Sequence, residues 1–253
     1  MEGHSILCYN QSMSSILIVG KDLPDGLEMA EAFASSGRSV FGVAKSEADV
    51  NSFESENIYA STWNKSSAVS AHSLIIKAET KLDKIEEVLF YFDTNYFCSK
   101  FEIDKTEEIS NAVDVMMNSF FYSTSELLRR IDQKKEKIIV SFLVREYPSK
   151  YEMLTSKSPV SVPAAGIVSA AQQAFISIAE TFAASVGEKD YLSVLLAKCQ
   201  INNEYYKNEK QIADWLAQSM VSIRAMKNPQ SVKQASTWNK VGSKVSTGFS
   251  IKN

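Results

Sequence analysis

An uncharged run at residues 158–179, S-P-V-S-V-P-A-A-G-I-V-S-A-A-Q-Q-A-F-I-S-I-A, constrains the fold of this chain most strongly. A segment of this length without charge must be buried, and a membrane span needs about 20 mostly apolar residues. Prolines, glutamines and serines interrupt the run, so it is too polar for a spanning helix. We therefore predict no membrane span. Instead we expect a loop that ends near Gly166, followed by a small-residue helix over 167–185 that packs tightly against other protein.

Apolar runs of strand length alternate with helical patterns along the whole chain. The strand-like runs lie at 15–20, 39–44, 57–61, 87–92, 137–144, 191–197 and 247–251. The other helical segments are predicted at 27–34, 68–78, 109–131 and 209–226. Apolar strands that alternate with helices are typical of a parallel sheet with helices on both faces. We predict an α/β fold, a doubly wound parallel sheet of the Rossmann type, as a single domain over 15–253 after an N-terminal extension over 1–14.

Composition excludes several classes of function. The net charge of -3 gives no basic surface for nucleic acid, and we predict no nucleic-acid partner. The three cysteines and two histidines have no metal-ligand spacing, so we predict no metal site. The first residues lack the basic and apolar regions of a signal peptide, and we expect a cytoplasmic protein.

Two features carry a family resemblance. A turn with Gly20 and Gly26 follows the first predicted strand, and the uncharged helix follows the fifth. This order resembles the short-chain dehydrogenase/reductase (SDR) family over nearly the whole chain. The resemblance implies NAD or NADP as cofactor, held by glycines that let the pyrophosphate approach a helix N-terminus. If a dinucleotide site is retained, Gly20, Gly26 and Lys45 are its expected residues, although Pro24 stands where the family has its middle glycine.

The residues at the family's catalytic positions differ from those that its chemistry needs. The family uses Tyr and Lys for proton transfer, together with an orienting Ser and Asn. Alignment of the uncharged helix places Val168 at the tyrosine and Gln172 at the lysine. Leu143 stands near the serine position, with Ser141 as the nearest hydroxyl, and Met116 stands at the asparagine, with Asn118 close by. All four positions are degenerate, so we predict no catalytic residue and most simply no cofactor.

The resemblance also implies self-association. In the family, two helices pair with their symmetry mates in homodimers or homotetramers, and the corresponding helices here carry few charges. The expected interface residues are Met117, Phe121, Ala171, Phe175, Ile178 and Phe182. We expect a homodimer or homotetramer, with an unidentified protein partner as a further possibility.

Three readings of the function stay open at this stage. The leading hypothesis is a catalytically inactive SDR-like protein that acts as an oligomeric scaffold, binding or regulatory protein. The alternatives are an NAD(P)-dependent oxidoreductase with nonclassical catalytic residues and a dinucleotide sensor without turnover. In the oxidoreductase reading, Tyr147 or Tyr151 would substitute for the lost tyrosine.

Overall fold

The chain folds around one parallel sheet of seven strands. The computed structural model describes residues 14–53, 55–101, 106–158, 160–186 and 189–245. The strand order is β3-β2-β1-β4-β5-β6-β7, and every neighbouring pair is parallel. The strands are β1 (Ser14–Val19), β2 (Arg38–Val43), β3 (Ile58–Ser61), β4 (Glu87–Asp93), β5 (Ile138–Glu146), β6 (Leu192–Gln200) and β7 (Trp238–Lys240). The predicted doubly wound α/β fold with a single domain is confirmed.

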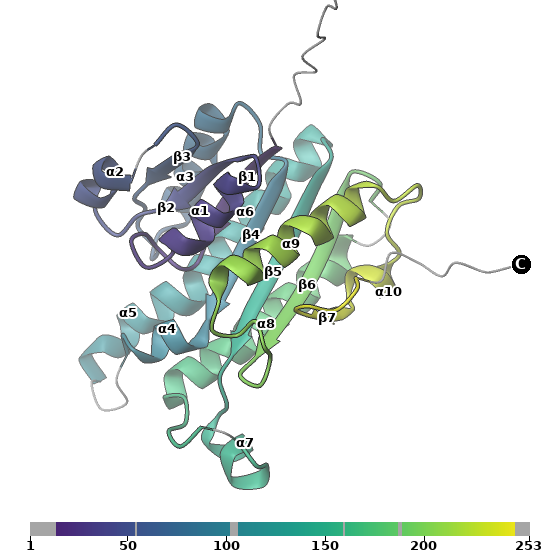
Figure 1. Ribbon diagram of the computed structural model, residues 1–253. Helices are drawn as coiled ribbons and strands as arrows, with labels where there is room; N and C mark the ends of the chain where they lie inside the picture. The colour runs from purple at the N-terminus through teal and green to yellow at the C-terminus, as the bar shows by residue number, and fades with distance from the viewer. Residues whose placement is uncertain (1–13, 54, 102–105, 159, 187–188, 246–253) are drawn as a thin grey trace, which may run out of the picture.

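Helices cover both faces of the sheet, as Figure 1 shows. One apolar cluster joins the sheet to α1 (Leu27–Ser35) and α9 (Glu209–Arg224), and the opposite cluster joins it to α3 (Ala68–Leu82), α6 (Ser119–Lys134) and α8 (Gly166–Val186). Because both faces are covered, the central strands are buried on both sides, and β4 is buried at every position from Glu87 to Asp93.

Four short α-helices in the described residues were not predicted from the sequence. They are α2 (Glu47–Phe53), α4 (Thr94–Cys98), α7 (Lys150–Thr155) and α10 (Val232–Ala235). Each has at most seven residues, which is too short to produce a clear helical period in the sequence. Figure 1 shows α7 projecting from the body of the molecule below the sheet.

The long helix predicted over 109–131 is interrupted in the structure. It is built from α5 (Ile109–Val113), a π-helical turn (Asp114–Asn118) and α6. A π-helical turn inserts one residue and changes the register between the two halves of a helix. The predicted strand at 247–251 lies outside the described residues, and β7 forms the seventh strand of the sheet.

The uncharged run enters the helix α8 at Gly166, as expected, and α8 packs against the sheet of the same chain. Its Phe175 packs against Phe92, Phe120 and Phe142, with ring centroids 4.8 to 5.9 Å apart. Apolar residues on one side of α8 therefore belong to the core of this chain. No helix in the described residues is long and apolar enough to cross a bilayer.

Candidate functional site

The candidate site lies at the carboxyl ends of β1, β4 and β5. The strand order reverses between β1 and β4, and open α/β sheets bind ligands in the crevice at such a switch point. Lys21 follows β1, Asp93 ends β4, and Arg145 pairs with Asp93 across the β4–β5 ladder. Charged side chains from three strands therefore meet where a ligand would be expected.

Four charges from distant parts of the chain form one buried network at this point, the charge quartet of Lys21, Asp93, Arg145 and Glu209. Arg145 Nη1 lies 3.1 Å from both Asp93 Oδ2 and Glu209 Oε1. Lys21 Nζ lies 3.2 Å from Asp93 Oδ2 and also contacts Glu209 Oε1. The four side chains are at most 12% exposed. Two cations thus face two anions, so the quartet is internally neutral.

Tyr91 completes the packing around the charge quartet. Its hydroxyl lies 3.3 Å from Asp93 Oδ2 and 3.4 Å from Glu209 Oε1. Complete burial and these two carboxylates raise the pKa of Tyr91 well above its usual range, so it stays a neutral phenol. The buried Tyr91 ring therefore fills space at the end of β4, beside the switch point.

The turn between β1 and α1 is closed by its own hydrogen bonds. The amide N–H groups of Gly26 and Leu27 donate to Asp22 O and Pro24 O at 3.0 Å each. These are the first amides of α1, which in a phosphate-binding turn would point at the ligand. Leu23 also joins the sheet, because its N–H donates to Val43 O at 2.7 Å.

The two glycines of this turn are required by the local backbone packing. Gly20 has φ +131°, and a Cβ on it would overlap the carbonyl oxygen of Tyr91. A Cβ on Gly26 would overlap the carbonyl oxygen of Lys21. Close backbone approach alone therefore requires glycine at both positions.

Lys45 lies at the end of β2 and is already paired. Its Nζ contacts Asp25 Oδ2, and Lys100 Nζ lies 3.6 Å from the same oxygen. Lys65 contacts Asp22 in the same region. A carboxylate therefore occupies the side of Lys45 that a cofactor phosphate would need.

Three of the four degenerate catalytic positions are apolar core residues. Val168, Leu143 and Met116 are each 0% exposed. None of them carries a group that transfers a proton. Asn118, the neighbouring amide, donates to Asp114 Oδ1 at 2.7 Å within its own helix.

Gln172, at the fourth degenerate position, joins three elements. Its Oε1 accepts a hydrogen bond of 2.5 Å from Thr94 Oγ1 and one of 3.3 Å from Tyr147 N. The side chain is buried. The neutral amide oxygen of Gln172 on α8 thus binds two other segments, the start of α4 and the loop that follows β5.

A groove of about 450 Å³ lies beside Gln172, outside the ends of β5 and β6. Tyr147 lines it, whereas Tyr151 on α7 is 74% exposed. Burial and the neighbouring Cys98 raise the pKa of Tyr147, which is the opposite of what a catalytic tyrosine requires. Neither tyrosine has a lysine among its described hydrogen-bond partners.

A Tyr-x-x-x-Lys spacing does occur elsewhere, and sequence reasoning missed it. Lys100 Nζ donates a hydrogen bond to the hydroxyl of Tyr96, four residues earlier. The spacing could have been found by scanning the whole chain rather than the aligned helix. Burial, Asp22 and Asp25 raise the pKa of Tyr96, whereas the pKa of Lys100 is lowered to about 8. The charge tuning of this pair is thus the reverse of a lysine that activates a tyrosine.

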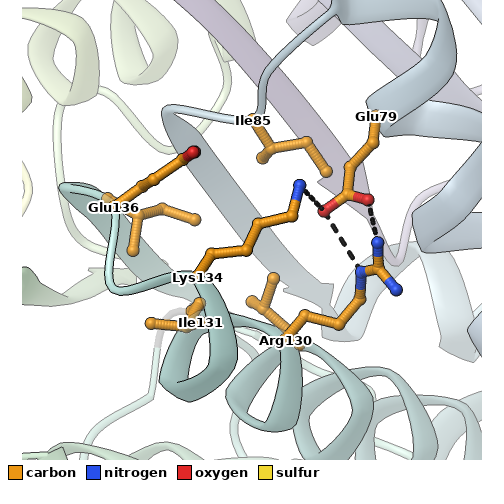
Figure 2. Close-up of a pocket in the computed structure, with 8 residues that line it drawn as sticks. Glu79, Ile85, Arg130, Ile131, Lys134 and Glu136 are labelled. Carbon is orange, nitrogen blue, oxygen red and sulfur yellow. Dashed lines mark hydrogen bonds and ion pairs between the residues drawn. The ribbon is translucent and has the colours of Figure 1, made fainter.

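A second hollow lies between α3 and α6, away from the switch point (Figure 2). Glu79 faces into it and pairs with Arg130 and Lys134. Its volume of about 30 Å³ is the space of roughly one water molecule. In the described residues, no group of three or more potential metal ligands is present here or elsewhere.

The expected interface residues fall into two sets. Ala171, Phe175, Ile178 and Phe182 are at most 7% exposed and pack within the monomer, so for these four side chains the expected interface position is corrected to a core position. The physical reason is that α8 turns its large apolar side chains toward the sheet. Phe121 is 49% exposed and Met117 is half-buried, so these two remain on the surface.

Comparisons with known proteins identify the fold. Neither models of protein families nor curated proteins match the sequence. Among solved structures, a short-chain dehydrogenase from Mycobacterium smegmatis matches with a TM-score of 0.62 at 13% identity, over 91% of this chain and 92% of that chain. A 3-ketoacyl-(acyl-carrier-protein) reductase from Brucella melitensis complexed with NADH matches with a TM-score of 0.60 at 14% identity, over 90% and 96%. ElxO with NADP bound matches with a TM-score of 0.56 at 14% identity, over 88% of both chains.

These likenesses show that the chain has the fold of the short-chain dehydrogenases. The switch-point residues do not fit a dinucleotide, however. The first amides of α1 are bonded within the turn, the charge quartet crosses the crevice, and Asp25 pairs with Lys45. A phosphate would have to displace all three sets of contacts.

Proposed function

We propose that this chain is a catalytically inactive relative of the short-chain dehydrogenases that acts in the cytoplasm as an oligomeric scaffold, binding or regulatory protein. The observation that carries the proposal is the burial of Val168, Leu143 and Met116 at the family's catalytic positions. Core side chains without a proton donor cannot perform the family's proton transfer.

The charge quartet supports a cofactor-free role. Breaking a buried ion pair costs about 3–5 kcal/mol, because it leaves an uncompensated charge in a medium of low dielectric constant. A dinucleotide that entered the crevice would incur this cost before it gained any contact. The fold without ligand is therefore the expected working state of the protein.

Self-association is the second part of the proposal. Met117 in the π-helical turn and Phe121 in α6 are four residues apart; Phe121 is 49% exposed and Met117 is half-buried. Apolar side chains exposed together on neighbouring turns are typical of an interface. We propose that this surface pairs with a second copy of the chain, in a homodimer or homotetramer.

Calorimetric titration of the purified protein with NADH and NADPH tests the inactive reading. A dinucleotide-binding short-chain dehydrogenase in the same buffer serves as the positive control. We expect no heat of binding up to millimolar nucleotide, and no reduction of a panel of aldehydes and ketones. Turnover would refute the proposal in favour of a nonclassical oxidoreductase, and micromolar binding without turnover would favour a dinucleotide sensor.

A further inference from the structure

Three lysines and two carboxylates gather beside the β1–α1 turn. The lysines are Lys45 after β2, Lys65 after β3 and Lys100 after α4, and the carboxylates are Asp22 and Asp25 of the turn. We call these five residues the lysine cluster. Within the described residues, the cations of this cluster outnumber its anions by one, so one ammonium group has no full counter-charge among them. An ammonium group in that position loses its proton more easily than an ordinary lysine.

Lys100 is the lysine with the weakest compensation. Lys45 and Lys65 make close contacts with Asp25 and Asp22, whereas Lys100 Nζ lies 3.6 Å from an Asp25 oxygen that Lys45 already occupies. The ammonium groups of Lys45 and Lys100 therefore share one carboxylate. Two ammonium groups that contact the same carboxylate oxygen repel each other, and this repulsion favours the neutral amine on one of them.

Tyr96 fixes the position of the Lys100 amine. The hydroxyl of Tyr96 accepts a hydrogen bond from Lys100 Nζ, which also lies 4.0 Å from the centroid of the ring. The Lys100 side chain remains 31% exposed, so it is in contact with solvent. Burial and then Lys45 lower the pKa of Lys100 to about 8, against the opposing effects of Asp25 and Asp22.

We propose that Lys100 is a nucleophilic amine that forms imines with small aldehydes. The neutral nitrogen attacks the carbonyl carbon and gives a carbinolamine, which loses water to form a C=N bond. One amine and one aldehyde thus give one imine and one water, and no electrons are exchanged. The step needs neither a dinucleotide nor the degenerate positions, so it is independent of the proposed scaffold function.

Reductive trapping tests the proposal on the full chain. The protein is incubated with propionaldehyde and cyanoborohydride at pH 7.5, and alkylation at each lysine is followed by peptide mass spectrometry. A pKa of about 8 instead of about 10.4 gives a roughly 200-fold larger share of neutral amine at this pH. Because a weaker base is also a weaker nucleophile, we expect Lys100 to react at least about tenfold faster than an ordinary lysine.

Lys210 is the internal reference, because it is 64% exposed and pairs only with Asp214 among its described ion-pair partners. Equal rates at Lys100 and Lys210 would overturn the proposal. The rate at Lys100 should also reach half its maximum near pH 8, whereas that at Lys210 should still rise at pH 9.

Substitution of Lys45 tests whether the reactivity of Lys100 comes from its charged neighbour or only from its exposure to solvent. In Lys45→Met, Lys100 itself is unchanged and no longer shares Asp25 with a second lysine. The pKa of Lys100 should then rise, and its alkylation at pH 7.5 should slow by at least about fivefold. The matched variant Lys210→Met should leave the rate at Lys100 unchanged. An unchanged rate in Lys45→Met, with a wild-type circular dichroism spectrum, would show that the two lysines are not coupled and would refute the mechanism.

Discussion

Thr94 Oγ1 donates a 2.5 Å hydrogen bond to Gln172 Oε1, which links two residues 78 positions apart. Thr94 begins α4 directly after β4, and Gln172 lies in the second turn of α8. The position at which a related enzyme would hold a charged lysine is thus occupied by a neutral acceptor. The bond joins the two sides of the degenerate catalytic region into one packed unit.

Restoring the family's side chains should not restore its chemistry. The double variant Val168→Tyr with Gln172→Lys should show no hydride transfer from NADPH, because the charge quartet and the bonded turn still cross the crevice. The lysine at position 172 should lower the free energy of unfolding by about 2–4 kcal/mol. It buries a charge and removes the oxygen that accepts the hydrogen bond from the Thr94 hydroxyl. Urea unfolding measures the loss, and Gln173→Lys is the matched control at an exposed neighbour. Measurable hydride transfer would show that the crevice admits a cofactor.

Gly20 should be far more sensitive to substitution than Gly37. Alanine at Gly20 would overlap the backbone of β4 at φ +131°, so we expect a loss of about 3 kcal/mol or more. Alanine at Gly37, with φ +83° and open space around it, should cost only about 1–2 kcal/mol. Thermal unfolding without any nucleotide distinguishes the two. Equal losses would contradict a packing role for Gly20.

The exposed aromatic ring of α6 should control self-association. Phe121→Glu places a charge in the proposed interface and should reduce the mass in solution to that of a monomer. Val221→Glu makes the same change at a 57% exposed position of α9 and should leave the mass unchanged. Light scattering coupled to gel filtration gives both masses. A wild-type monomer would remove the self-association part of the proposal.

Glu79 should make stability depend on pH in acid. Burial alone would raise its pKa, but hydrogen bonds from Arg130 and Lys134 outweigh burial and leave the pKa below 4.5. The depressed carboxyl stabilises the fold above pH 4.5, and this contribution is lost as the pH falls through the pKa of the folded state. Glu79→Gln should therefore cost about 1 kcal/mol at pH 7, and the difference from wild type should shrink below pH 4. A difference independent of pH would contradict this ion pairing.

The sheet could be predicted from sequence because its signal is local. Each predicted strand from β1 to β6 is an apolar run bounded by turns, as at 87–92, and burial on both faces produces that run directly. The short β7 at Trp238–Lys240 carries no such run, and its polar middle residue gave no strand signal.

The charge quartet could not be predicted, because its members are separated in sequence by up to 188 positions. Lys21 looked like an ordinary turn residue, and Glu209 like the first acid of a solvated helix. Only the register of β4 against β5, which pairs Asp93 with Arg145, and the docking of α9 bring them together. The direction of side chains on α8 was missed for a similar reason, since an uncharged helix gives no polar face from which to read its orientation.

The charge quartet also changes how the folded state depends on its surroundings. A protein that needs a bound nucleotide gains stability in proportion to the logarithm of the free nucleotide concentration. Lys21, Asp93, Arg145 and Glu209 belong to one covalent chain, so their mutual concentration never varies. For the proposed role, the amount of folded protein would follow its synthesis and degradation alone and would be unaffected by swings in the redox state of the cell.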